Sequence, residues 1–364
     1  MPNITSLITR RIKPICAVWE ITLRCNSNCI HCGSKAGESR LSELSTNEAL
    51  NLVKELHDCG YKGVALMGGE PLIRKDWYEI AREIKKQKMD LSIVTNGLNL
   101  KQQSQNLKKV KPDCVSLSLD GATPKVHDYI RGVQGSFKKT LEAIELLKDL
   151  KIPTSVITSV NKINLKELNL IKNLLLGRNI AWQIQICVPI GRFPKDLVIT
   201  REEFYTLALF IAINQKKYSS RRLPLIGAHC LGHFSRFIPN LGLSPWVGCQ
   251  AGLSVLGIQS NGNIKGCLTL PDKYIIGNVR SKTLKEIVEN LRAQKKLLPS
   301  MCKNCDLVKS CRGTCLGTAY ALKDQYCLRA IEKDIFNVEQ LSIKRKLDST
   351  YSKIRNFYYN LIIR

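Results

Sequence analysis

Short apolar runs alternate with amphipathic segments from residue 15 to about residue 190. This alternation predicts repeated β–α units, in which parallel strands are joined by helices. The apolar runs predict six strands, at residues 15–23, 63–67, 91–95, 114–119, 154–160 and 181–188. Six units are too few to close an eight-stranded barrel. We therefore expect an α/β fold, an open partial (β/α)6 barrel of the TIM type, with functional residues at the carboxyl ends of its strands.

The segments between these runs predict the helices. Ser45 and Glu48 have the spacing of a capping box, and Leu50, Val53 and Leu56 follow on one helix face. Further helices are expected at residues 77–88, just before residue 112, and at residues 137–150, 165–176 and 201–217.

A change of composition after residue 218 predicts a second domain. More than half of the 15 cysteines lie between residues 226 and 330, where glycines are frequent and apolar runs are short. Such a region is expected to fold around metal more than around a hydrophobic core. The expected parts are an N-terminal extension (1–14), the barrel (15–218), a linker (219–248), a Cys-rich domain (249–330) and a C-terminal helix (331–364).

The chain is strongly basic, with 56 Lys and Arg against 30 Asp and Glu and a formal net charge of +26. This charge suits nucleic acid, an acidic surface or an acidic peptide as partner. Lysines are spread along the whole chain, so nucleic acid is not the expected substrate. The N-terminus lacks a signal-peptide pattern, and the longest nearly apolar run, residues 204–213, is half a membrane span. We expect a cytoplasmic protein with no membrane partner.

Three cysteines follow the first predicted strand with the spacing C-x3-C-x2-C, at Cys25, Cys29 and Cys32. Three thiolates suit a four-iron cluster that leaves one iron without a protein ligand. A zinc site would need a fourth ligand nearby. His31 is adjacent to Cys32 and is poorly placed to share a tetrahedron with it.

The second predicted strand ends in the sequence Gly68-Gly69-Glu70-Pro71. Two glycines allow the backbone to approach a ligand closely, and the carboxylate can accept hydrogen bonds from an ammonium group. A glycine-rich turn with a surface Glu is the alternative interpretation. The position at the next strand end after the cysteine triplet favours the functional one.

A second cysteine series occupies the C-terminal region. Cys249 is followed by a Gly-x4-Cys motif that ends at Cys267, and then by four cysteines at C-x2-C-x5-C-x3-C spacing and a final cysteine, namely Cys302, Cys305, Cys311, Cys315 and Cys327. Paired C-x2-C thiolates with long intervals indicate interleaved metal sites. The spacing alone leaves zinc and iron–sulfur clusters open.

Together these motifs resemble the radical S-adenosylmethionine (radical SAM) superfamily, and the C-terminal series resembles its SPASM extension. The resemblance implies that Cys25, Cys29 and Cys32 hold a 4Fe–4S cluster whose open iron chelates S-adenosylmethionine. One electron would cleave this cofactor to a 5′-deoxyadenosyl radical that abstracts hydrogen from the substrate. By the same resemblance the cofactor-binding residues are Gly68, Gly69, Glu70, Pro71, Asn96, Ser118, Asp120 and Arg131.

The resemblance also implies two auxiliary 4Fe–4S clusters, three clusters in all. The outer one would be held by Cys302, Cys305, Cys311 and Cys327, and the inner one by Cys249, Cys267 and Cys315. Cys230 is a candidate for the fourth ligand of the inner cluster. Cys187, near the end of the sixth predicted strand, is either a buried inert thiol or a catalytic hydrogen-atom donor.

Oxidative modification of a peptide or protein is the first functional hypothesis, with a ribosomally made peptide as substrate and a crosslink or other carbon-centred change as outcome. A low-potential electron donor of the flavodoxin or ferredoxin type would be required. Only 24 residues precede Cys25, so we expect a separate protein, or another surface, to bind a leader peptide.

Three alternatives remain. Formylglycine formation in a sulfatase is disfavoured, because Leu268 stands where that branch usually has an acidic residue. Modification of a small molecule or a tetrapyrrole is the second. The non-enzyme alternative is a basic metal-binding protein that binds nucleic acid.

Overall fold

The computed structural model describes residues 15–231, 235–243, 245–293, 298–323 and 326–336. The predicted N-terminal extension, 1–14, lies outside these residues. So does the predicted C-terminal helix beyond residue 336, while its first residues belong to a described helix.

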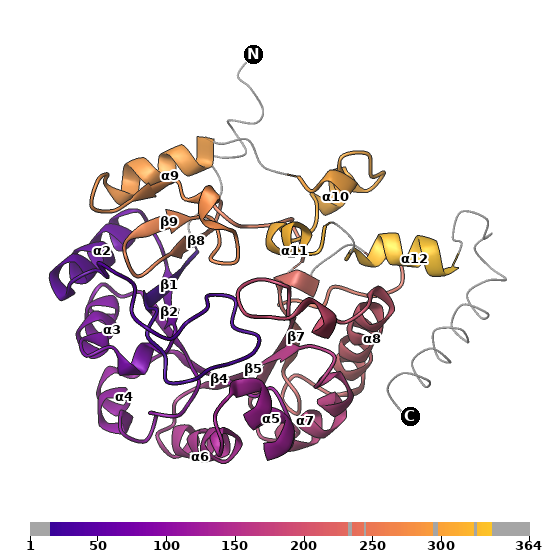
Figure 1. Cartoon of the computed structure of the whole chain (residues 1–364), viewed down its shortest axis with the longest axis horizontal. Helices are drawn as coiled ribbons and strands as arrows, with labels where there is room; N and C mark the ends of the chain where they lie inside the picture. Colours follow the sequence, from indigo (N-terminus) through magenta and orange to yellow (C-terminus); the bar gives the residue numbers. More distant parts are fainter. Residues whose placement is uncertain (1–14, 232–234, 244, 294–297, 324–325, 337–364) are drawn as a thin grey trace.

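One sheet of ten strands runs through the molecule (Figure 1), in the order β10-β9-β8-β1-β2-β3-β4-β5-β6-β7. The eight strands from β8 to β7 are parallel, whereas β9 and β10 are antiparallel to their neighbours. The strand bounds are Cys16–Thr22 (β1), Gly63–Gly68 (β2), Asp90–Thr95 (β3), Cys114–Ser118 (β4), Thr154–Val160 (β5), Ala181–Ile186 (β6), Leu225–Gly227 (β7), Val255–Ile258 (β8), Asn263–Lys265 (β9) and Gly277–Asn278 (β10).

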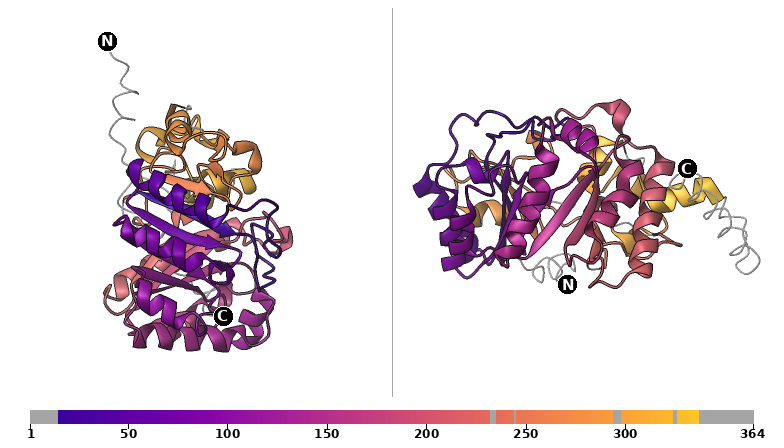
Figure 2. Two further views of the ribbon diagram at one scale, coloured as in Figure 1. Left: turned by 90° about the vertical axis from the view of Figure 1, so that its left-hand side faces the viewer. Right: turned by 90° about the horizontal axis from the view of Figure 1, so that it is seen from below.

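Helices lie on the outside of the curved sheet and give it the outline of a partial barrel (Figures 1 and 2). The helices of the barrel are α2 (Thr46–Asp58), α3 (Trp77–Lys86), α4 (Ser104–Val110), α5 (Pro124–Arg131), α6 (Ser136–Asp149), α7 (Leu168–Leu175) and α8 (Arg201–Lys217). The C-terminal region adds α9 (Leu284–Ala293), α10 (Val308–Cys311), α11 (Leu316–Ala321) and α12 (Leu328–Phe336). The helices among the described residues are all too short or too polar to span a lipid bilayer.

Burial follows the expected periodicities. The central strands are buried on both faces, as in β1, where Trp19 and Ile21 are fully buried and Glu20 on the opposite face is also buried. In α3 the buried residues Trp77, Ile80 and Ile84 share one face at helical spacing. Ser45 forms the predicted capping box with Glu48 at the start of α2. The predicted partial barrel is therefore confirmed.

The structure contains elements that the sequence analysis did not predict. Helix α5 begins at Pro124, its N-cap Thr123 accepts a hydrogen bond from a helix N–H, and Gly132 ends it with φ +65°. Strand β7 lies in the predicted linker and pairs with β6. Strand β8, from the predicted Cys-rich domain, pairs with β1. The barrel sheet therefore continues on both sides beyond its six predicted strands.

Candidate functional site

The cysteine triplet lies in the loop between β1 and α2, at the carboxyl end of the sheet. Two backbone N–H groups point at its sulfurs, Ser27 N at 3.4 Å from Cys25 Sγ and Ala36 N at 3.3 Å from Cys32 Sγ. Such N–H donors stabilise thiolate, the form of cysteine that binds metal. The loop thus carries sulfur donors with supporting hydrogen bonds already in place.

The two glycines after β2 allow this loop to pack against the strand end. A Cβ atom on Gly68 would lie 2.1 Å from the carbonyl oxygen of Thr22, and one on Gly69 would lie 2.2 Å from that of Arg24. The backbone N–H of Gly69 donates to the Thr22 carbonyl at 2.8 Å. Both glycines are therefore required by the close approach of the chain to itself, whatever ligand they also contact.

Glu70 is fully buried and joins the ends of two strands. Its carboxylate accepts hydrogen bonds from Leu72 N at 3.1 Å, Thr95 Oγ1 at 2.7 Å and Asn96 N at 2.7 Å. Burial raises the pKa of Glu70, against the effect of these donors. Pro71 follows it as the buried first residue of a 3-10 turn, Pro71–Ile73.

Asn96 ties the end of β3 to the cysteine loop. Its side-chain amide donates to Asn26 Oδ1 at 2.8 Å and to Ser27 Oγ at 3.0 Å, while its Oδ1 accepts from Leu98 N. The Asn96 side chain thus holds the cysteine loop through two of its residues. Ser118 lies half-buried at the end of the neighbouring strand β4.

Asp120, which follows β4, is the centre of a buried charged group. Its carboxylate lies 3.0 Å from His31 Nε2, accepts a hydrogen bond from Arg131 Nη1 at 3.2 Å, and accepts another from Ser159 N at 2.8 Å. Burial disfavours the ionised carboxyl, but His31 and Arg131 outweigh it, so the pKa of Asp120 lies below its ordinary value. Asp120 therefore joins the cysteine loop, β5 and helix α5.

Two cations of this group favour negative charge on the cysteine loop. Although burial opposes thiolate formation, Arg131 and His31 lower the pKa of Cys29 below its ordinary value. Burial also opposes the charged form of His31, yet the Asp120 carboxylate raises the pKa of this imidazole to about 9. By contrast, burial raises the pKa of Cys25 to about 11. Of these two cysteines, only Cys29 has a pKa that the cations bring below its ordinary value.

Arg192, in the segment between β6 and α8, also holds the cysteine loop. The sequence analysis did not predict this residue. Its Nε donates to Cys29 O at 3.2 Å, its Nη1 to Ala36 O at 2.8 Å, and its backbone N–H to Cys32 O at 3.0 Å. Gly191 has φ +69°, and a Cβ on it would lie 2.2 Å from Cys32 O. The Gly-Arg pair was the available signal, but only the fold brings it to the cysteines.

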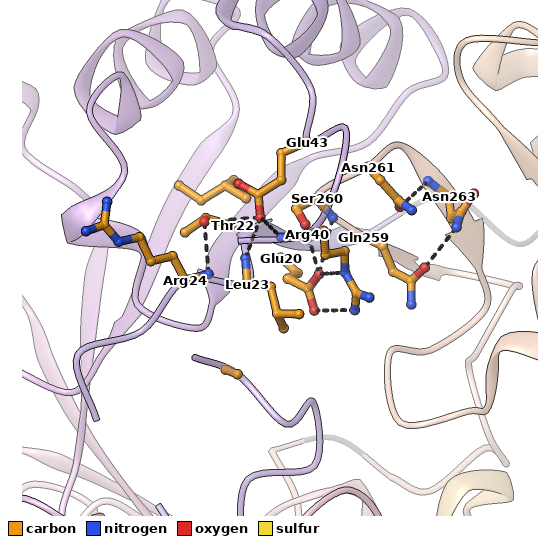
Figure 3. A network of polar contacts seen from close by, with 12 residues as sticks. Glu20, Thr22, Leu23, Arg24, Arg40, Glu43, Gln259, Ser260, Asn261 and Asn263 are labelled. Atoms are coloured by element: carbon orange, nitrogen blue, oxygen red, sulfur yellow. Dashed lines mark hydrogen bonds and ion pairs between the residues drawn. The ribbon is translucent and has the colours of Figure 1, made fainter. Parts of the chain in front are cut away.

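A second network links the cysteine-bearing loop to the C-terminal region (Figure 3). Arg40 Nε donates to the buried Glu20 carboxylate at 2.7 Å, and Ser260 Oγ donates to the same oxygen at 3.2 Å. Glu43 accepts hydrogen bonds from Leu23 N and Arg40 N. The sequence analysis also missed this network, which fixes β8 and β9 next to the end of β1.

In the C-terminal region the structure brings the predicted inner cysteines together. Burial and the nearby sulfurs of Cys315 and Cys267 raise the pKa of Cys249. Burial also raises the pKa of Cys230 to about 12, with a contribution from Cys315. Ile186 N lies 3.5 Å from the Cys230 sulfur. Cys230 thus lies near both the end of β6 and Cys315.

Three of the predicted outer cysteines, Cys302, Cys311 and Cys327, lie near one another. Burial raises the pKa of Cys327 to about 11, and Cys311 and Cys302 contribute to the shift. Cys302 and Cys311 are buried, and Cys305 Sγ lies 3.6 Å from Asp306 Oδ1. Trp246 Nε1 donates to Cys311 O at 2.9 Å and packs this segment against the region before Cys249.

Cys187 directly follows strand β6. Its thiol donates to Ser159 O at 3.4 Å, and Asn161 Nδ2 lies 3.9 Å from its sulfur. Burial and the Asp120 carboxylate raise the pKa of this thiol well above its ordinary value. It is therefore protonated at neutral pH, as a hydrogen-atom donor must be.

The side chains at these sites are chemically suited to bind iron–sulfur clusters. Three thiols in one loop, with N–H donors at two sulfurs and a buried guanidinium near the third, suit an anionic group with thiolate ligands. Within the described residues, no group of three or more His, Cys, Asp or Glu side chains has the spacing for a single metal ion.

Two family profiles match the chain. The Radical SAM superfamily profile matches residues 19–175, and the SPASM iron–sulfur cluster-binding domain profile matches residues 249–315. Among relatives, the chain is 30% identical over 344 residues to an AdoMet-dependent heme synthase of Methanosarcina barkeri, covering 88% of this chain and 96% of the relative. It is 27% identical over 316 residues to the mycofactocin maturase MftC of Mycobacterium ulcerans, covering 84% of each.

A solved structure has the same fold. Streptococcus suis SuiB bound to S-adenosylmethionine superimposes with a TM-score of 0.69 at 20% identity, over 87% of this chain and 76% of that one. The cofactors that both domains imply are S-adenosylmethionine and 4Fe–4S clusters, one at the cofactor site and two auxiliary. The chain therefore belongs to the radical SAM enzymes that carry a C-terminal SPASM iron–sulfur domain.

Proposed function

We propose that this radical SAM enzyme modifies a tetrapyrrole in heme formation. The observation that carries the proposal is the 30% identity to an AdoMet-dependent heme synthase, which extends over 96% of that relative. A similarity of this length includes both the barrel and the Cys-rich region, so it goes beyond the cofactor chemistry that all radical SAM enzymes share.

We assign Cys25, Cys29 and Cys32 to the cluster that binds S-adenosylmethionine. The remaining cofactor contacts are assigned to Gly68, Gly69, Glu70, Pro71, Asn96, Ser118, Asp120 and Arg131. The inner auxiliary cluster is assigned to Cys249, Cys267 and Cys315 with Cys230, and the outer one to Cys302, Cys305, Cys311 and Cys327. When bound, these groups supply a reducing electron, the hydrogen-abstracting radical and an acceptor for the electron left over.

The chain's own residues hold this site in shape. Gly69, Asn96 and Arg192 fix the cysteine loop from three different strand ends. Arg131 and His31 place positive charge beside Cys29, which favours thiolate ligands over thiols. Since these contacts exist within the protein, little reorganisation is needed when the cofactors bind.

The proposed reaction converts a propionate side chain into a vinyl group. The propionate would lose one hydrogen atom, one electron and CO2, and the bound cofactors would supply the acceptors of the hydrogen atom and of the electron. Two hydrogens and CO2 therefore leave for each vinyl group formed from the acid. The formal charge of +26 supports a substrate with several carboxylates, although an acidic peptide would profit from it equally.

The test is an anaerobic reaction of reconstituted protein with S-adenosylmethionine, dithionite and iron coproporphyrin III, a porphyrin with several propionates. We expect 5′-deoxyadenosine together with porphyrin products that have lost CO2 and two hydrogens per converted side chain. Cys29→Ala is the control for both products. Cleavage of S-adenosylmethionine with an unchanged porphyrin would overturn the tetrapyrrole assignment while leaving the radical chemistry intact.

Peptide modification is the second candidate, supported by the 27% identity to a mycofactocin maturase over 84% of both chains. It would require a precursor peptide and a separate leader-binding protein or surface. Cys187 would serve as the hydrogen donor if the outcome were epimerisation. Both candidates need a low-potential electron donor of the flavodoxin or ferredoxin type. A mass change on a peptide encoded near this chain, with no change on porphyrin, would select this candidate.

A further inference from the structure

Arg329 lies at the start of helix α12, two residues after Cys327. Its side chain is only 15% exposed. Two of its N–H groups, at Nε and Nη1, are buried and have no hydrogen-bond partner among the described residues. A buried guanidinium usually has its donors satisfied, because leaving them unpaired forfeits their hydration. The orientation of this side chain therefore requires an explanation.

The nearest carboxylate does not provide one. Arg329 Nη2 lies 3.9 Å from Asp306 Oδ2, longer than a hydrogen bond, and the Asp306 side chain is 58% exposed. An exposed pair at this distance contributes little. It also leaves Nε and Nη1 unpaired.

The backbone and the side chain of Arg329 lie beside residues of the outer cysteine segment. The backbone N–H groups of Arg329 and Ala330 donate to the sulfur of Cys327, which caps the first turn of α12. The other oxygen of Asp306 lies 3.6 Å from Cys305 Sγ. Cys302 and Cys311 lie close enough to Cys327 to contribute to the raised pKa of its thiol. The residue thus reaches from Cys327 at its backbone to the neighbourhood of Cys305 at its guanidinium.

We propose that Arg329 is a positioning residue for the outer auxiliary cluster, to which its Nε and Nη1 groups donate, and that it raises the reduction potential of that cluster. This inference rests on the assignment of Cys302, Cys305, Cys311 and Cys327 to one cluster. A cluster with four thiolate ligands is anionic and becomes more so on reduction. A buried cation and hydrogen bonds to sulfur both favour the reduced form, so their loss makes reduction harder.

The test measures the midpoint potential of each auxiliary cluster by EPR-monitored titration. The full chain carries Cys25→Ala, Cys29→Ala and Cys32→Ala, so that the cluster that binds S-adenosylmethionine does not contribute signals. Into this background we place Arg329→Gln, which removes the charge, and Arg329→Lys, which keeps the charge but not the fork of donors. Lys309→Gln is the matched control, because it removes the same charge at an exposed position in the same cysteine segment.

We expect one of the two midpoint potentials to become more negative in Arg329→Gln and to shift less in Arg329→Lys. Both potentials should stay unchanged in Lys309→Gln. Unchanged potentials in Arg329→Gln at full iron content, about eight irons per chain, would overturn the proposal.

If Arg329→Gln loses iron, its potentials cannot be compared, and the proposal is tested on Arg329→Lys instead. An unshifted potential in Arg329→Lys, with iron retained, would also count against the hydrogen bonds. The cluster assignment is tested separately by Cys302→Ala with Cys305→Ala, which should remove about four irons. None of these measurements uses a substrate, so they are independent of the tetrapyrrole proposal.

Discussion

The two cysteine-bearing regions are held in different ways. The loop of Cys25, Cys29 and Cys32 is fixed by residues far along the chain, through Asn96, Asp120 and Arg192. The segment from Cys302 to Cys315 is held largely by its own neighbours, as in the bonds from Cys305 N to Cys302 O and from Cys311 N to Leu307 O. Trp246 is a more distant contact of this segment.

This difference indicates which of the two regions is folded in the absence of its cluster. The barrel builds the first loop from strand ends that a large hydrophobic core already fixes. In the C-terminal segment the elements are short, such as the four residues of α10 and the six of α11. Such elements bury little apolar surface, so cluster binding is expected to supply much of their stability.

The largest expected effect concerns activity. Cys29→Ala should reduce S-adenosylmethionine cleavage to background while leaving the melting temperature close to that of the wild type, because the loop is held by other residues. Cleavage is measured as 5′-deoxyadenosine formed anaerobically with dithionite. Cys59→Ala, at the end of α2 and outside the site, is the control and should retain activity.

Removal of iron should separate the two regions. In chelator-treated protein, limited proteolysis is expected to cut first between residues 298 and 323 and to leave the barrel, residues 15–218, intact. Mass spectrometry of the early fragments locates the cuts. First cleavage within residues 25–32 would contradict the comparison, since it would make the barrel loop the more metal-dependent of the two.

Asp120→Asn tests the distant contacts of the first loop. The change leaves His31 of the cysteine loop and Arg131 of α5 buried without their carboxylate, and the loss of one partner from a buried charged pair costs about 3 kcal/mol. Urea denaturation of the iron-free chain measures the free energy of unfolding. If the loss were below about 1 kcal/mol, the contact between His31 and Asp120 would not be what fixes the loop to the end of β4.

A smaller effect is expected from the packing of the loop on β2. Gly69→Ala places a Cβ 2.2 Å from the Arg24 carbonyl oxygen, which should cost about 2 kcal/mol as the two segments separate. Gly37→Ala, in the same loop with no atom within 4 Å of the added carbon, is the matched control. Equal stability of the two variants would show that the close approach at Gly69 is unimportant.

The sequence predicted what depends on local pattern. The six barrel strands and most of their helices follow from apolar periodicity, and the cysteine spacings identified the family. Helix α5 was missed although Thr123, Pro124 and Gly132 carry ordinary cap signals, because only eight residues separate these caps. Strands β7 and β8 have three and four residues, too short for a periodic signal.

The supporting residues of the site could not be predicted for a different reason. Arg192 contacts Cys29 across 163 residues of sequence and Glu20 contacts Ser260 across 240. No local spacing encodes such contacts. The sequence analysis also ranked peptide modification before tetrapyrrole modification. Motifs that all radical SAM enzymes share do not distinguish these substrates, whereas the 30% identity to a heme synthase over 88% of this chain supports the tetrapyrrole proposal.

The pairing of β8 with β1 has a consequence for biosynthesis. Strand β1 is among the first parts of the described chain to leave the ribosome, yet its partner on one side ends at Ile258. At about 5–20 residues per second, translation of the intervening chain takes on the order of 10–50 s. During that interval the nascent barrel presents an unpaired edge at β1, beside the cysteine triplet. Protection of this edge from pairing with other chains therefore matters most before the C-terminal half is made.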